Sequence, residues 1–395
     1  MREGTDAIAG IAERRAYDLK LVLATVALVV LGLIMIASAS QMVRLRTASG
    51  PHFYFFLRQL ALAALGFCVM AALMRVPYHL YRRFSWVMLI ASVALLLAVF
   101  IIGTKVRGST RVINIIKFDF QPVEAAKVAL VIFLAARLSE CGDRVRDFAK
   151  GFMPLAGTGL GMAILVALQP NISNAALILM LTFAILFVAG CRVKHLVWFG
   201  LIILAGSVPL LMRVSKVTTR LDAYLKGLAG DGGSFQLNQS FIAFGSGWLF
   251  GCGPGQGHQK YRFLPDPHTD FIYSIIGEEL GLVGTILVLL AFVFILRRAV
   301  RTARRAPDSF GALLAMGTGL LLFLSAVVNI AMTIGVIPTA GLPLPFISYG
   351  GSSLVISLAA IGILAGISVE GRERAFADEL FGLRRTARKV YARRR

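Results

Sequence analysis

Ten long apolar runs, separated by charged or Gly/Pro-containing segments, constrain the fold of this chain more than any other feature. The runs cover residues 19–41, 53–74, 85–102, 123–138, 151–168, 173–190, 196–212, 271–296, 310–337 and 354–368. A helix needs about 20 apolar residues to cross a bilayer core. Of the 395 residues, 57% are apolar or aromatic and only 15% are charged, which excludes an ordinary soluble domain. The sequence therefore predicts an all-α, polytopic membrane protein with ten transmembrane helices.

The distribution of Lys and Arg sets the expected orientation. Of the 41 basic residues, 25 fall in one alternating set of connections and termini and 12 in the other. Because cytoplasmic segments carry the excess of Lys and Arg, both termini are expected in the cytoplasm. We expect a cytoplasmic N-terminal segment (1–18), one membrane domain (19–368) and a basic cytoplasmic tail (369–395). The tail favours contact with anionic membrane lipid, and we expect no nucleic-acid partner.

One connection, residues 213–270, is much longer than the others and is expected to be an extracytoplasmic loop between helices 7 and 8. Long loops are where function concentrates. Its second half is rich in glycine and then polar, with Lys260, His268 and Asp270 close together. Asp270 directly precedes an apolar run, where partial loss of water would make it a better general base. The alternative is that Asp270 only caps the following helix.

Several charged residues fall inside or at the ends of apolar runs. Glu278 and Glu279 are candidates for function because intramembrane carboxylates are costly, and a buried structural pair is the alternative. We expect at least one of them to find a partner in the bundle, with Lys127 and Arg58 as the candidates. Glu124 and Lys127 are three residues apart and would pair locally on one helix face.

Two outer segments indicate a ligand. Lys105, Arg107 and Arg111 place three cations in a short outer connection, which an anionic partner at the outer leaflet would explain, and solvated loop charge is the alternative. Residues 341–353 predict irregular backbone near membrane depth, and such backbone requires a protein-lined or water-filled cavity. The sequence contains no Walker loop, Rossmann glycine pattern, HExxH or GxSxG motif, and its four cysteines are scattered, so nucleotide, zinc and disulfide chemistry lack support.

Three motifs together resemble one known family. They are GLPLPFISYGGSS over 341–353, the GSG, QK, HTDF and IGEELG elements over 245–281, and the stretch 108–127 with Arg111 and FQPVEAAK. In this order they resemble the SEDS family (shape, elongation, division and sporulation) of bacterial membrane proteins, its FtsW branch more than its RodA branch. The resemblance runs over nearly the whole chain.

The resemblance implies a peptidoglycan glycosyltransferase that polymerises lipid II at the outer face of the plasma membrane. Asp270, in the HTDF motif, is then the expected catalytic residue and the base on the acceptor hydroxyl. The expected substrate-binding residues are Arg111, Lys260, His268, Glu124, Lys127, Ser348 and Ser352. Glu278, Glu279 and Arg58 are expected as structural or intramembrane polar residues. The 341–353 segment would help form the groove for the polyprenyl chains.

The family also implies partners and a location. A class B penicillin-binding protein (a transpeptidase) and other divisome proteins are expected partners, at the bacterial inner membrane and the division septum. No organic cofactor is expected, while a divalent cation such as Mg²⁺ or Mn²⁺ would offset the charge of the leaving diphosphate. One departure stands out, because Asn171 occupies the position after Gln169-Pro170 where the family usually has Asp. A role for that Asp cannot be transferred to this chain.

Three other functions stay open from the sequence. A lipid II flippase would use the same cavity together with the charges of Glu278, Glu279, Lys127 and Arg58. An elongation-type, RodA-like polymerase would share the chemistry but not the division role. A non-catalytic scaffold for division proteins is the third. The polar cluster near Asp270 favours an enzyme, because transporters usually place their sites at the bilayer midplane.

Overall fold

The computed structural model describes residues 17–40, 54–106, 109–115, 118–212, 214–229, 233–259 and 268–370. In chain order its elements are α2 (Leu19–Ser40), α3 (Tyr54–Leu73), α4 (His79–Arg83), α5 (Ser85–Ile102), β1 (Thr104–Val106), β2 (Ser109–Ile115), β3 (Phe118–Phe120), α6 (Pro122–Cys141), η2 (Gly142–Arg146), η3 (Phe148–Phe152), α7 (Met153–Ala167), α8 (Ile172–Val188), α9 (Val193–Leu211), α10 (Ser215–Ala229), α11 (Phe235–Gly247), α12 (Ile272–Arg305) and α13 (Ser309–Thr333). A last helix, Gly351–Glu370, closes the described chain.

Each of the ten apolar runs contains a helix. Within the described ranges, seven helices are long and apolar enough to cross a membrane, and α8 and α9 are shorter apolar helices. Helix α6 is 20 residues long but carries Glu124, Lys127, Arg137 and Glu140. The prediction of a helical multi-pass membrane protein is confirmed, whereas the number of ten crossings stays a prediction.

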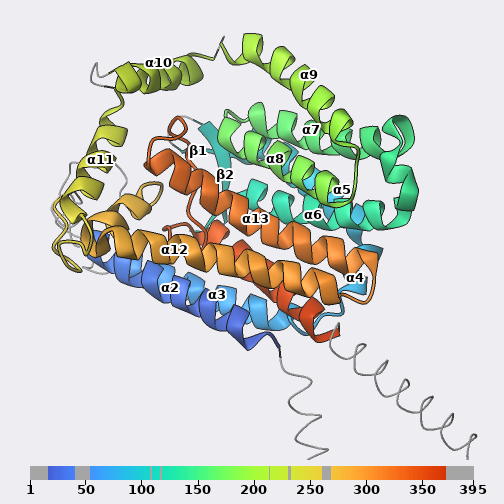
Figure 1. The fold of residues 1–395 in the computed structure, drawn as a ribbon, viewed down its shortest axis with the longest axis horizontal. Coiled ribbons are helices and arrows are strands. Elements are labelled where there is room, and N and C mark those ends of the chain that lie inside the picture. The colour runs from blue at the N-terminus through green and yellow to red at the C-terminus, as the bar shows by residue number, and fades with distance from the viewer. Residues whose placement is uncertain are drawn as a thin grey trace, which may run out of the picture.

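The last helix, Gly351–Glu370, lies at the centre of the bundle, and 83% of its most apolar stretch is buried. Helices α12 and α13 pack side by side (Figure 1), and α13 also contacts α6 and α8. Small residues permit close packing, as at Gly317 of α13, where an added Cβ would lie 2.7 Å from Cγ1 of Val131. Apolar side chains fill the spaces between these helices.

The two ends of the described chain meet at the same end of the bundle (Figure 1). Just before α2, Asp18 is buried and accepts a hydrogen bond from Nε of Arg298 in α12 at 2.6 Å. Ile367 and Ser368 of the last helix line the same small cavity as this pair. An even number of crossings requires this arrangement.

The long connection contains more regular structure than expected. It contains helices α10 and α11, which together with α9 form an arch that leaves the bundle and returns to the start of α12 (Figure 1). The hydroxyl of Tyr224 in α10 donates to the carbonyl of Val336 at 2.9 Å, and Arg220 donates to the carbonyl of Thr339 at 3.2 Å. The outer connection before α6 is also regular, because β1, β2 and β3 form a small antiparallel sheet in that order. Neither feature was expected from the sequence.

Helix α12 is interrupted at Gly281, which has a φ of 66°. The amides of Leu282 and Val283 donate to the carbonyls of Trp248 and Leu249, at 2.8 and 3.1 Å. The glycine-rich segment after α11 therefore supplies the hydrogen bonds that the helix lacks at the break. A residue with a Cβ would be strained at this φ and would also meet the backbone of Leu249.

Candidate functional site

Asp270 lies in a turn whose backbone is held by the segment 341–353. The Asn329 amide donates to the carbonyl of Asp270 at 3.0 Å and to that of Leu342 at 2.6 Å. The Ser348 hydroxyl donates to the carbonyl of Thr269 at 2.6 Å. These bonds fix the position of the Asp270 backbone relative to a segment about 70 residues later in the chain.

Asp270 does not occupy the N-cap position of the helix that follows it. The N-cap of α12 is Phe271, so Asp270 lies one residue before it, within the turn at 268–270. Its side chain is partly exposed. The catalytic role expected for Asp270 stays a prediction.

Arg111, from β2, reaches the same point as Asp270. A Cβ added at Gly341 would lie 3.6 Å from an Asp270 carboxylate oxygen and 3.8 Å from an Arg111 guanidinium nitrogen. A side chain at Gly341 would therefore contact both an anionic and a cationic group. The structure brings these two predicted site residues together from segments about 160 residues apart.

A groove of about 370 Å³ opens beside these groups, and we call it the outer groove. Its walls come from the start of α8, from α10 and from the chain that follows α13. Apolar side chains predominate, with Arg111 and Arg220 as its cations. Its lining residues are Arg111, Pro170, Asn171, Ile172, Ser173, Ala176, Leu177, Met180, Val214, Val217, Arg220, Leu221, Val328, Ile337, Pro338, Thr339, Ala340 and Gly341. This shape and chemistry suit a lipid chain that ends in an anionic group.

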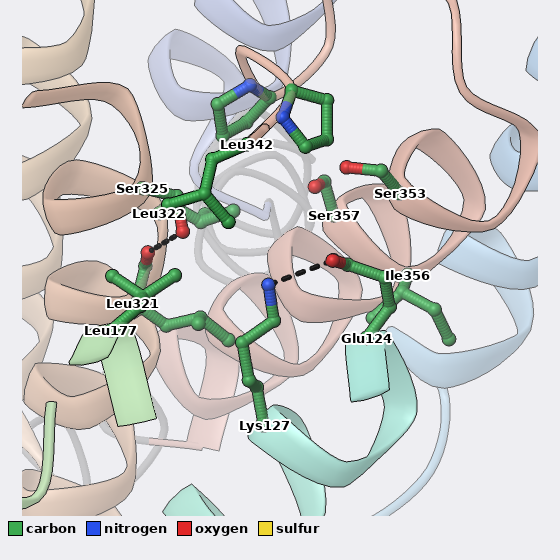
Figure 2. Close-up of a pocket in the computed structure, with 12 residues that line it drawn as sticks. Glu124, Lys127, Leu177, Leu321, Leu322, Ser325, Leu342, Ser353, Ile356 and Ser357 are labelled. Atoms are coloured by element: carbon green, nitrogen blue, oxygen red, sulfur yellow. Dashed lines mark hydrogen bonds and ion pairs between the residues drawn. The ribbon is translucent and has the colours of Figure 1, made fainter. Parts of the chain in front are cut away.

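Glu124 and Lys127 form the predicted local pair, buried beside the outer groove. The Lys127 ammonium lies 2.8 Å from the Glu124 carboxylate and 3.2 Å from the Asn174 amide oxygen. They line a separate cavity of about 20 Å³, enough for one water molecule (Figure 2). Leu177 lines both cavities. Direct contact of Glu124 and Lys127 with substrate therefore stays a prediction.

A chain of hydrogen bonds connects this buried pair to the outer groove. Asn174 donates to the Asn171 side chain at 3.0 Å while accepting from Lys127. The Asn171 amide nitrogen is buried without a hydrogen-bond partner within the described residues, and Asn171 lines the groove. The Asn171 side chain therefore accepts from Asn174, while the two N–H donors of its own amide nitrogen have no partner among the described residues.

The other two predicted hydroxyls have structural partners. Ser348 also accepts from the Leu344 amide at 2.8 Å, in addition to its bond to Thr269. Ser352 donates to the carbonyl of Asp119 and accepts from the Gln121 amide, both at 2.9 Å. These bonds connect the segment 341–353 to the turn at 268–270 and to β3. Substrate binding by Ser348 and Ser352 stays untested.

His268 lies in an aromatic cluster on the other side of the turn. Its ring centroid is 5.2 Å from that of Phe55 and 5.7 Å from that of Tyr349. Burial raises the pKa of the Tyr349 hydroxyl, and nearby Arg58 lowers it in part. Arg58 itself pairs with Asp119 at 3.2 Å. The predicted polar role of Arg58 is thus an ion pair at the outer surface, between α3 and β3.

The expected partners of Glu278 and Glu279 were wrong. Glu278 accepts from the amides of His258 and Gln259 at 2.6 and 3.0 Å. Glu279 accepts from the Ser38 hydroxyl at 2.6 Å and from the Gly255 amide at 2.9 Å. The prediction assumed cationic side chains, but backbone amides of the glycine-rich segment satisfy these carboxylates. They anchor that segment against α12 and α2.

The remaining predictions concern two basic side chains and a metal ion. Lys260 and Arg107 lie outside the described residues. Among the described residues, no group of three or more His, Cys, Asp or Glu side chains could hold a metal ion.

The sequence analysis missed several residues of the site. Asn329, Arg220 and Tyr224 all bind backbone carbonyls of residues 270 or 335–342. A polar residue within an apolar run was the available signal for Asn329, and an amphipathic 215–229 helix was the signal for the other two.

Comparisons with known proteins agree on one protein family. Residues 19–373 match the cell cycle protein family of FtsW, RodA and SpoVE. The chain is 40% identical over 361 residues to "Probable peptidoglycan glycosyltransferase FtsW" of Geobacter sulfurreducens, covering 90% of this chain and 96% of that one. It is 38% identical to stage V sporulation protein E of Bacillus subtilis, covering 90% and 98%.

Solved structures show the same fold. A chain from a study titled "Structural coordination of polymerization and crosslinking by a peptidoglycan synthase complex" matches with a TM-score of 0.73 and 26% identity, covering 90% of this chain and 98% of that one. The rod shape determining protein RodA of Thermus thermophilus matches with a TM-score of 0.66 and 27% identity, covering 89% and 97%.

Proposed function

The chain belongs to the cell cycle protein family of FtsW, RodA and SpoVE, and on this premise we propose that Asp270 is the base of its glycosyl transfer reaction. The chain is a peptidoglycan glycosyltransferase that polymerises lipid II into glycan strands, as expected from its resemblance to the family. One observation carries the assignment of the base. Asp270 and Arg111 both lie within contact distance of the position that a side chain at Gly341 would occupy, and Arg111 and Gly341 line the outer groove.

The reaction follows from the two charges. The Asp270 carboxylate takes the proton of the acceptor sugar hydroxyl as the oxygen of that hydroxyl attacks the anomeric carbon of the donor. The bond from that carbon to the diphosphate oxygen breaks, and the lipid diphosphate leaves with the bonding electrons. Arg111 offsets the negative charge that develops on the diphosphate. A single displacement of this kind inverts the configuration at the anomeric carbon.

The outer groove holds the lipid part of a substrate. Its apolar walls suit a polyprenyl chain, while Arg111 lies where the diphosphate would enter. Arg220 and Tyr224 hold α10 against the groove through the carbonyls of Thr339 and Val336. We therefore place the polyprenyl diphosphate of the donor in the outer groove. We place the acceptor hydroxyl on the Asp270 side of Gly341.

Two further proposals concern the partner proteins of the chain and its cellular location. We propose a class B penicillin-binding protein as the transpeptidase partner, together with other divisome proteins. The structural similarity to a chain of a peptidoglycan synthase complex that coordinates polymerization and crosslinking supports this proposal. The multi-pass fold and the relatives named FtsW support the bacterial plasma membrane and the division septum.

Glycan formation from labelled lipid II tests this proposal. The chain is purified with its co-expressed class B partner, and wild type is compared with Asp270→Asn. Asp222→Asn is the matched control, because Asp222 is an exposed carboxylate on α10, in the same outer connection. Polymer from the wild type and the control but not from Asp270→Asn supports the assignment. Movement of labelled lipid II across proteoliposomes without any polymer would favour the flippase instead.

A further inference from the structure

A second cavity of about 370 Å³ lies at the end of the bundle away from Asp270, where α5 begins and α6 ends. We call it the inner basic cavity. It is lined by Arg137, Arg144 and Lys150, by the carboxylate of Glu140 and by the rings of Trp86 and Phe133, among others. The predicted orientation places this end at the cytoplasmic leaflet. The glycosyl transfer mechanism uses none of these residues.

The charges in the cavity leave an excess of donors. Its three cations face one carboxylate, Glu140, which lies 2.9 Å from Arg137 and also 3.6 Å from Arg82. The Nε atom of Arg137 is buried and has no hydrogen-bond partner in the part of the chain that the structure describes. The cavity lining therefore carries a net positive charge, which favours an anionic ligand.

The other wall of the cavity is aromatic and continues toward lipid. The Trp86 and Phe133 rings pack edge to face, with centroids 4.7 Å apart, and the Arg137 guanidinium lies 5.6 Å from the Trp86 ring centroid. Trp86 is half exposed, and Val87 and Ile90 on the same helix are also exposed. Tryptophan at this depth is typical of the membrane interface. The cavity therefore joins a basic pocket to a lipid-facing apolar surface.

We propose that the inner basic cavity binds the headgroup of an anionic phospholipid of the cytoplasmic leaflet. The phosphate lies among the cationic side chains of Arg137, Arg144 and Lys150, while an acyl chain runs along Trp86 and Val87. A zwitterionic headgroup adds an ammonium that these cations repel, so net negative charge decides the preference. The occupant is distinct from the substrate, which reacts at the other end of the bundle.

Tryptophan quenching by brominated lipids tests this proposal. The chain has three tryptophans, so Trp198→Phe with Trp248→Phe leaves Trp86 as the reporter. The full chain is reconstituted with phosphatidylglycerol or phosphatidylcholine that carries bromine on its acyl chains. We expect the relative association constant at Trp86 to favour phosphatidylglycerol by about tenfold, and Arg144→Gln with Lys150→Gln to remove that preference.

The control removes the same charge elsewhere on this face. Arg297→Gln with Arg304→Gln removes two exposed cations of α12 that do not line the cavity. The control variant should retain the preference. Equal quenching by the two lipids in the parent would overturn the proposal, and so would an equal loss in the control, which would indicate diffuse surface charge. Because the lipid comparison in the parent needs no cavity substitution, a cavity variant that fails to fold does not prevent the test.

Discussion

The space beside Gly341 offers a graded test of the site. An alanine there would place its Cβ 3.6 Å from Asp270 and 3.8 Å from Arg111, both ordinary contacts, so Gly341→Ala should retain near wild-type activity. Each further carbon reaches about 1.5 Å beyond the last. We expect a leucine to displace one of the two groups, and a displacement of about 1 Å costs roughly 100-fold in rate, or about 2.7 kcal/mol of barrier.

The assay is the initial rate of glycan formation from labelled lipid II by chain purified with its class B partner. Gly161→Leu in α7 is the matched control, because no atom lies within 4 Å of a Cβ added there. A Gly341→Leu variant with the wild-type rate would show that the reaction does not use this space. An equal loss in Gly341→Ala would show that backbone conformation, not volume, is the cause.

Three further predictions concern positioning, stability and orientation. Asn329→Asp has the same shape but cannot donate to the carbonyls of Asp270 and Leu342, so we expect polymerisation to fall at least tenfold and the melting temperature to decrease; unchanged values for both would refute the positioning role. The backbone amides of Lys150 and Ala149 hold the pKa of Asp147 below its usual value of 3.8. The Asp147 carboxylate therefore stabilises the fold above pH 3.8, and this stabilisation is lost as the pH falls through the folded-state pKa. Asp147→Ala should therefore lower the melting temperature at pH 7, with a difference that shrinks below pH 3.8; a pH-independent difference would contradict this reasoning. Cys252 is exposed and on the predicted outer side, so a membrane-impermeant maleimide should label it in intact spheroplasts but leave Cys141 unlabelled; the reverse pattern would invert the orientation.

The helices could be predicted from the sequence because membrane crossing imposes a length and an apolar composition on each one. The run at 310–337 corresponds to α13 at Ser309–Thr333, and the run at 354–368 to the last helix at Gly351–Glu370. The run at 271–296 was extended in the structure, since α12 continues through a basic segment to Arg305. Basic residues are good helix formers but did not belong to an apolar run.

The site could be predicted only in part. Asp270 and Arg111 were expected from the family resemblance, and the structure brings them to one point. Asn329 was missed because its partners are backbone carbonyls, which leave no pattern in a sequence. The partners of Glu278 were wrong for the same reason, because amides of the glycine-rich segment take the place of the expected cations.

Separate measurements of binding and chemistry for Asp270→Asn and Arg111→Gln test the central claim most directly. Lipid II affinity is measured on the chain purified with its class B partner, and polymerisation is followed in a single turnover of preloaded substrate. The account predicts that Asp270→Asn binds lipid II as the wild type does but loses polymerisation by a factor of about 100 to 10,000, whereas Arg111→Gln weakens both. A folded Asp270→Asn variant that binds lipid II and polymerises it at the wild-type rate would contradict the assignment of Asp270 as the base.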